Sequence, residues 1–297
     1  MTVRSATLVL LLALPSAAWA QGGDAIGVQF ENAPSTRLEG DSAPENQPEY
    51  RFRNVRANAI APIALERWNA VLLPGFGYRL YAPTETIVGP DGIDTEPFHD
   101  LSLRFGVVKR LGDHWSLLVN VGAGLATNFS DVNRDHFRFQ GVSLASYTFG
   151  NSLTLGFGVL STYSFGELLV LPALQLRYVK DRWRVNALAP QFLRATYELF
   201  DGVEFGVVAQ VDGNRFSIGD SENIDSVSFS QADAGLTVGA NVIGPVWVTV
   251  SAGTTLQRRF VVFGPNDEEL ADLTAERGPV YRLGVVLRGE GGSDGTP

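Results

Sequence analysis

Histidine, serine and acidic side chains are the groups of this 297-residue chain that could carry out catalysis or bind a metal ion. His114 and Ser116 have a spacing that suits a hydrolytic pair, but no complete set of Ser, His and acid stands out. The segment 131–135 begins like a calcium-binding loop, yet its sixth position is His136 instead of Gly and its twelfth is Val142 instead of Glu. We therefore expect no enzyme, no cofactor and no metal site.

Acidic residues gather in four segments, 31–49, 82–98, 218–226 and 264–276, in a chain whose net charge is −9. Such loops could form a rim that attracts cations and shares divalent ions with lipopolysaccharide phosphates, or they could be solvated loops that charge keeps soluble. Net acidity also argues against nucleic acid as a partner. The candidate rim residues are Glu85, Asp91, Asp94, Glu96, Asp267, Glu268, Glu269 and Asp272.

Apolar and polar residues alternate along most of the chain, and this period of two predicts β-strands. Many runs are longer than the usual strand of about 5 or 6 residues. Short turns alternate with connections that are mostly longer, which is typical of a closed antiparallel up-and-down transmembrane barrel. We predict about 14 strands, with 12 as the alternative, at 24–31, 50–65, 67–81, 99–111, 114–128, 136–149, 152–164, 169–180, 182–189, 191–200, 203–218, 226–242, 246–263 and 277–288.

Charged residues on these strands fall in the phase that would face the interior of the barrel. An arginine on the lipid face would cost about 2–4 kcal/mol at the membrane midplane, so the inward phase is preferred. The inward set either lines a pore and tunes its selectivity, or forms salt bridges that fill a closed lumen. It comprises Arg51, Arg53, Arg56, Arg104, Arg138, Arg177, Arg184, Arg194, Arg282, Glu198, Glu204, Asp212 and Asp233.

Four tryptophans each follow a short polar turn at the start of an alternating run: Trp68, Trp115, Trp183 and Trp247. The indole has an apolar body and a polar N–H, so it prefers the headgroup level of a membrane. We predict that these residues form a periplasmic aromatic girdle, which would place the long acidic loops on the extracellular side.

The N-terminus has the features of a cleaved secretory signal over residues 1–20: Arg4, an apolar stretch at 6–14 and the small-residue site Ala18-Trp19-Ala20. The barrel is then expected at 21–288, followed by a flexible polar tail at 289–297. The chain has no cysteine, which suits an exported protein that does not rely on disulfides.

The part of the chain from His99 to about Phe205 resembles a family of Gram-negative outer-membrane β-barrels whose domain has no known function. This resemblance implies a barrel fold and an outer-membrane location, and it implies no activity and no functional residues. The matching segments are Asp113-His114-Trp115-Ser116-Leu117, Leu144–Phe149, Leu155–Val159, Leu169–Leu174, Asp181–Asn186, Ala189-Pro190 and Ala195–Leu199.

The sequence thus predicts a single outer-membrane barrel that serves as a passive pore or transport channel for small solutes, with a mouth that favours cations. The alternatives are a non-conducting structural or adhesive barrel that binds lipopolysaccharide, divalent ions or a partner, and, third, a lipid-modifying enzyme. The partners expected are outer-membrane lipid, lipopolysaccharide and, during biogenesis, the barrel-assembly machinery.

Overall fold

The computed structural model of the chain describes residues 24–39, 50–83, 97–129, 132, 134–218 and 223–288. The predicted signal segment, the predicted tail, and Glu85, Asp91, Asp94 and Glu96 lie outside these residues. Within them the chain forms strands, turns and three short 3₁₀ segments, and it has no helix that is long and apolar enough to cross a membrane.

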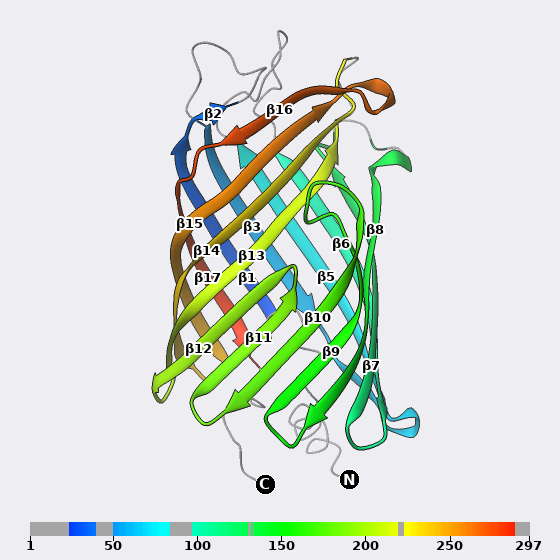
Figure 1. Cartoon of the computed structure of the whole chain (residues 1–297), viewed down its shortest axis with the longest axis vertical. Helices are drawn as coiled ribbons and strands as arrows, with labels where there is room; N and C mark the ends of the chain where they lie inside the picture. The colour runs from blue at the N-terminus through cyan, green and yellow to red at the C-terminus, as the bar shows by residue number, and fades with distance from the viewer. Residues whose placement is uncertain are drawn as a thin grey trace, which may run out of the picture.

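The strands follow one another as antiparallel neighbours (Figure 1). Their bounds are β1 (Asp24–Thr36), β2 (Leu38–Glu39), β3 (Tyr50–Ile60), β4 (Ile63–Leu65), β5 (Ala70–Pro83), β6 (Phe98–Leu111), β7 (Trp115–Thr127), β8 (Phe137–Phe149), β9 (Leu153–Thr162), β10 (Leu169–Lys180), β11 (Trp183–Ala189), β12 (Phe192–Phe200), β13 (Val203–Ser217), β14 (Ser226–Ile243), β15 (Val246–Phe263), β16 (Glu269–Ala275) and β17 (Pro279–Arg288). The 3₁₀ segments are η2 (Glu66–Trp68), η3 (Arg134–His136) and η4 (Pro265–Asp267).

The ring closes where the first strand pairs with the last. β1 and β17 are antiparallel from Asp24 opposite Arg288 to Asn32 opposite Tyr281, and β17 also pairs with β15. With β4 as a continuation of β3, and with β2 and β16 outside the main ring, the closed barrel has 14 strands. The predicted fold class and the larger strand count are confirmed.

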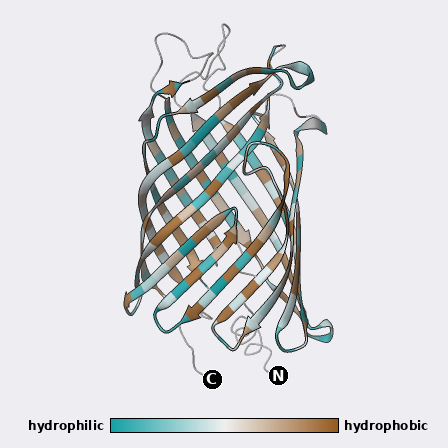
Figure 2. Cartoon of the chain, viewed as in Figure 1, coloured by the Kyte–Doolittle hydropathy of each residue, from teal (hydrophilic) through white to brown (hydrophobic). Residues whose placement is uncertain are grey.

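Alternation along the strands separates an apolar outer face from a more polar interior (Figure 2). Leu103, Phe139 and Phe157 are each at least 60% exposed on the outer face, whereas their neighbours in the sequence point inward. A large exposed apolar surface of this kind is what a lipid-facing barrel requires.

The connections at one end of the barrel are tight turns. Gly112, Gly150, Asp181, Gly202 and Gly244 each adopt a positive φ there, which glycine and aspartate tolerate better than most residues. We call this end the short-turn end and the opposite one the long-loop end.

The sheet closes a second time near the long-loop end. Ser217 at the end of β13 forms a parallel bridge with Thr127 at the end of β7. Strands β8 to β12 therefore take part only in the part of the barrel that lies toward the short-turn end. On the other side, β15 pairs with β16, and β16 pairs with β2, which continues β1. The result is a smaller ring at the long-loop end, which we call the upper ring. It is formed by β1 with β2, β3, β5, β6, β7 and β13 to β16.

Aromatic side chains fill the upper ring. The Phe52 and Phe229 ring centroids are 5.0 Å apart, and Phe216 lies 5.0 Å from Tyr81. These contacts join β3 and β5 to β13 and β14 across the interior. Barrels of about eight strands have an interior that side chains alone can fill. We call this cluster the aromatic plug; it comprises Phe52, Tyr81, Phe98, Phe216, Phe229 and Phe260.

The position of Phe52 corrects part of the predicted inward set. Because Phe52 is buried in the plug, its neighbours Arg51 and Arg53 point to the outer face, where both are exposed. The pairing of β3 with β5 runs without a register shift from Phe52 to Ile60. Arg56, Asn54 and Phe52 therefore all point to the inner face. The inward prediction for Arg51 and Arg53 is therefore wrong, because it requires a bulge near Asn54 and the β3–β5 pairing has none there.

Candidate functional site: the charged lumen

A cavity of about 320 Å³ lies inside the barrel. Its lining comes from both sides of the ring, including β1, β3, β5, β6, β13 and β17, and among the described residues no member of the aromatic plug contributes to it. The charged lining residues are Arg56, Arg79, Arg104, Arg138, Arg194, Arg282, Asp100 and Asp212.

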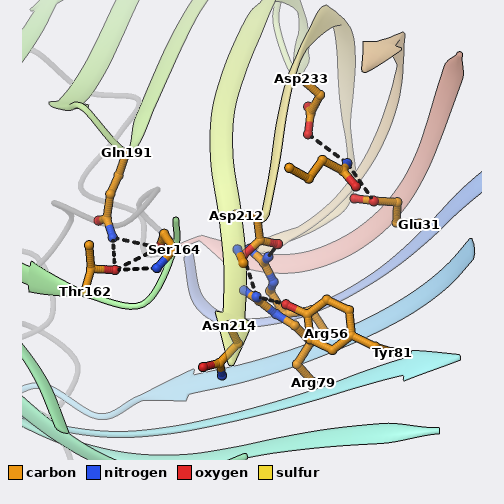
Figure 3. A network of polar contacts seen from close by, with 12 residues as sticks. Glu31, Arg56, Arg79, Tyr81, Thr162, Ser164, Gln191, Asp212, Asn214 and Asp233 are labelled. Atoms are coloured by element: carbon orange, nitrogen blue, oxygen red, sulfur yellow. Dashed lines mark hydrogen bonds and ion pairs between the residues drawn. The ribbon is translucent and has the colours of Figure 1, made fainter. Parts of the chain in front are cut away.

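Asp212 on β13 crosses the lumen to two arginines (Figure 3). One carboxylate oxygen pairs with Arg56 of β3 and the other with Arg79 of β5, and the Arg79 guanidinium also bonds the Tyr81 hydroxyl at the base of the plug. Since β13 is a neighbour of neither β3 nor β5 in the sheet, these ion pairs hold opposite walls together.

A second network lies at the seam where the barrel closes. Arg282 of β17 binds Glu31 of β1 at 2.7 Å and Asp233 of β14 at 2.6 Å. Gln231 donates to Glu31 and to Asp233, and it accepts a hydrogen bond of 3.0 Å from Arg258. All five side chains are buried; Arg282 pairs with both carboxylates, and Arg258 bonds the neutral Gln231, so each buried charge has a polar partner.

A third network lies nearer the short-turn end, around Glu204 of β13. Its carboxylate accepts hydrogen bonds from Arg194 at 2.6 Å and Arg288 at 2.8 Å, and Arg184 lies 3.9 Å away while also bonding Glu198. A Cβ added to Gly239 would lie 2.8 Å from the Glu204 side chain, so the glycine on β14 leaves the space that this carboxylate occupies.

The edge of β13 is unpaired between two points. Pairing with β12 ends at Gln210 opposite Phe192, and the bridge to β7 occurs only at Ser217. Between them, side chains take over the backbone hydrogen bonds: Gly213 N–H donates to the Asp212 carboxylate, Arg215 N–H donates to Asn214, and the Arg215 carbonyl accepts from Arg138. We call the stretch Asp212–Phe216 the wall gap.

Beside the wall gap lie the connections of the short strands β9 to β12, at 163–168 and 190–191, which we call the low rim (Figures 1 and 3). The Gln191 side chain donates to the hydroxyls of Thr162 at 3.1 Å and Ser164 at 3.2 Å. Tyr163, Ser164 and Gln191 line the cavity, as do five consecutive residues of β13, Gln210 to Asn214. The cavity therefore reaches the unpaired edge of β13 and the low rim.

The structure places the predicted inward residues in these networks. Arg104, Arg138, Arg194, Asp212 and Arg282 line the cavity, and Arg184, Glu198 and Glu204 form the network near the short-turn end. Arg177 lies on the inner face of β10, in the same phase as buried Ala173 and Gln175.

Five further charged residues of the lumen were missed in the sequence: Glu31, Arg79, Asp100, Arg258 and Arg288. Arg79 could have been found, because it shares the phase of Gly75, Gly77 and Tyr81 on one strand. The acidic pattern groups Glu31 with the segment 31–49, whereas in the structure β1 continues to Thr36.

Three of the four predicted girdle tryptophans are exposed at the short-turn end. Trp115 packs against Tyr147 at 5.1 Å and Trp183 against Tyr197 at 5.0 Å, both on the outer face, and Trp68 ends η2. The tyrosines extend the aromatic band beyond the tryptophans that the sequence singled out.

Trp247 differs from the other three in its direction. It is paired with Val286, which lines the lumen, and the Arg288 guanidinium lies 4.3 Å from its ring centroid. Since directly opposed residues share a face, Trp247 points into the barrel and does not belong to an outward girdle. Its position after the Gly244-Pro245 turn suggested the girdle, but Trp247 alternates with outward Val250 and shares the phase of Thr249 and Ser251, which line the cavity.

Of the predicted acidic rim, the four residues of the 264–276 segment can be placed. Asp267 pairs with Arg215, and Asp272 pairs with Arg259 at 2.7 Å. The hydrogen bond from Arg259 holds the pKa of Asp272 below its usual value. Glu268 and Glu269 are exposed beside them, so two of these four acids are offset by arginines.

A closed antiparallel ring with an apolar outer face and a charged interior defines a β-barrel of the outer-membrane type. The chain belongs to the family described as Domain of unknown function (DUF6268), whose profile matches residues 92–265. Comparison with curated proteins gives no match.

Two solved structures are similar to this chain. An outer-membrane channel from Pseudomonas putida F1 is 11% identical, with a TM-score of 0.45 over 93% of this chain and 97% of that one. The toluene transporter TodX of Pseudomonas putida is 7% identical, with a TM-score of 0.33 over 94% of this chain and 93% of that one.

Proposed function

We propose that the protein is an outer-membrane channel for small solutes, and that solutes pass between the lumen and the outside through the wall gap instead of through the long-loop end. The single observation that carries this proposal is the extent of the cavity. It borders the unpaired edge of β13 and the low rim, and no described residue of the aromatic plug lines it.

The energetics favour the same route. Opening the plug would expose large aromatic side chains, each of which contributes about 1.5–3 kcal/mol when it is buried. Opening the low rim would break a few side-chain hydrogen bonds such as those of Gln191, each worth about 0.5–1.5 kcal/mol. The low rim is therefore the element that can open at the smaller cost.

A refolded barrel in liposomes tests the channel directly through the swelling rate in a small sugar such as arabinose. Ser251 lines the cavity, and its neighbour Val250 is exposed on the outer face. Ser251→Trp should lower the swelling rate by filling the cavity, while Val250→Trp should leave it unchanged. Swelling by the wild type at the rate of protein-free liposomes would refute the channel.

The second candidate is a non-conducting structural or adhesive barrel whose acidic loops bind lipopolysaccharide or a partner through divalent ions. The observation that favours it is the closure of the upper ring by packed side chains. This candidate requires that neither the wild type nor any variant of the low rim produces swelling. The cation preference expected for an acidic mouth would be a property of the first candidate alone.

A further inference from the structure

The charge of the cavity wall is opposite to that of the whole chain. Six arginines and two aspartates line the cavity, so the formal charge of the lining is +4; the three acids that pair with Arg194 and Arg282 reduce it to +1, whereas the chain carries −9. Acids are concentrated in the connecting segments, and arginines are concentrated inside. A solute in the cavity therefore meets a positive field in a site where low-dielectric walls focus it.

Two carboxylates in the lumen each form ion pairs with more than one arginine. Asp212 serves both Arg56 and Arg79, and Glu204 serves Arg194 and Arg288. A guanidinium has five N–H donors, so one carboxylate cannot use all the donors of two arginines. In the Asp212 network the buried Nε of Arg56 has no hydrogen-bond partner among the described residues, so this network retains a donor for an additional acceptor.

Two glycines of β7 leave space beside the inner wall that β6 to β8 form. Gly122 and Gly124 of β7 point inward between Arg104 on β6 and Arg138 on β8, which lie in register with them. The Arg104 guanidinium extends over Gly77 of β5, because a Cβ at that position would be 3.6 Å from Nη2. These glycines leave space between the two arginines, with the side chains of Ser102, Gln140 and Asp100 at its edges. The Arg138 guanidinium lies on the other side of this space, where it bonds the Arg215 carbonyl and the Ser217 hydroxyl.

The same cavity offers apolar contacts. Phe192 lies on the inner face of β12 and packs against a buried aliphatic cluster whose members come from β5 to β11. Arg138 is 5.7 Å from the ring centroid of Tyr163, so an aromatic ring lies directly beside this arginine. The volume of about 320 Å³ is at the lower end of the range for small-molecule sites, roughly 300–1,000 Å³.

We propose that the cavity is a binding site for a small organic carboxylate, with Arg104 and Arg138 as the residues that receive the negative group. Arginine matches the planar, bidentate geometry of a carboxylate. This inference names the solute class of the channel proposed above and rests on that function for its biological meaning. It also predicts that the lumen favours anions even where the outer loops are acidic.

Equilibrium dialysis of the folded full-length barrel in detergent tests binding without requiring conduction. The probes are radiolabelled benzoate and benzylamine, which have similar size and opposite charge. We expect saturable binding of benzoate that weakens with added salt, and no saturable binding of benzylamine. Arg104→Gln and Arg138→Gln should each weaken benzoate binding about tenfold or more, since a hydrogen bond to a charged group contributes about 1.5–3 kcal/mol.

Arg53→Gln is the matched control, because it removes an arginine that is exposed on the outer face of β3. Its benzoate affinity should equal that of the wild type. Saturable binding of benzylamine at least as tight as that of benzoate would overturn the proposal, and so would unchanged benzoate binding in both lumen variants. Benzoate binding without liposome swelling would refute the channel and leave the anion site standing.

Discussion

Arg79 of β5 and Asp212 of β13 form an ion pair across the lumen, between strands that are not neighbours in the sheet. The same carboxylate accepts the N–H of Gly213 at the unpaired edge of β13. One acid therefore joins the two walls of the barrel and also satisfies the backbone at the wall gap. The contact lies between the aromatic plug, whose Tyr81 hydroxyl bonds Arg79, and the cavity that Arg79 and Asp212 line.

Asp212→Asn should destabilise the barrel. The substitution leaves Arg56 and Arg79 facing a neutral amide, and removal of one partner from a buried ion pair costs about 3–5 kcal/mol. Urea-induced unfolding in lipid vesicles, followed by the shift in gel mobility on heating, measures the loss. Asp201→Asn, at an exposed turn, serves as the control and should change stability by less than about 0.5 kcal/mol.

The directions of the tryptophans give a second prediction, which uses variants that retain a single tryptophan. Brominated lipids should quench the fluorescence of Trp115 and Trp183, because both lie on the outer face. They should leave Trp247 largely unquenched, since it stacks on Arg288 inside the barrel. Equal quenching of Trp247 and Trp115 would contradict the inward position.

The sequence predicted the ring of strands well because lipid imposes a strict alternation of apolar and polar residues on a barrel. Glu204 and Asp212 were placed inside by phase alone, and the structure shows both on the inner face of β13. What the sequence did not reveal is contact between strands that are distant in the ring, such as Phe52 with Phe229. Alternation assigns a face to each residue, but it carries no information about which opposite strand that face meets.

The aromatic plug should contribute strongly to stability. Phe229 contacts Phe52, Tyr81 and Phe260, so Phe229→Ala would leave a cavity in a packed core and cost about 3–5 kcal/mol. Phe157→Ala, on the outer face where the ring is 60% exposed, is the matched control. Unfolding in lipid vesicles should show the larger loss for Phe229→Ala, and equal losses would indicate that the plug is not packed.

The seam network should matter for ring closure. Arg282→Met removes the cation shared by Glu31 and Asp233, leaves two buried carboxylates facing each other, and should cost about 3–5 kcal/mol. Arg259→Gln removes the partly exposed pair with Asp272 and should cost at most about 1 kcal/mol. The pH of the unfolding measurement should be kept near 7, because acid would protonate Asp272 and remove the contribution of that pair. A seam variant no less stable than Arg259→Gln would contradict the role of Arg282.

The route of the solute is tested most directly by liposome swelling of two cysteine pairs in a chain that has no cysteine of its own. Thr127→Cys with Ser217→Cys joins β7 to β13 and locks the upper ring around the plug. Thr162→Cys with Gln191→Cys, bridged by a bifunctional thiol reagent that replaces the length of the Gln191 side chain, ties the end of β9 to the 190–191 connection of the low rim. Passage through the wall gap predicts that crosslinking stops swelling in the second pair and that oxidation leaves the first unchanged. Swelling that stops when the first pair is oxidised and continues when the second is crosslinked would contradict it.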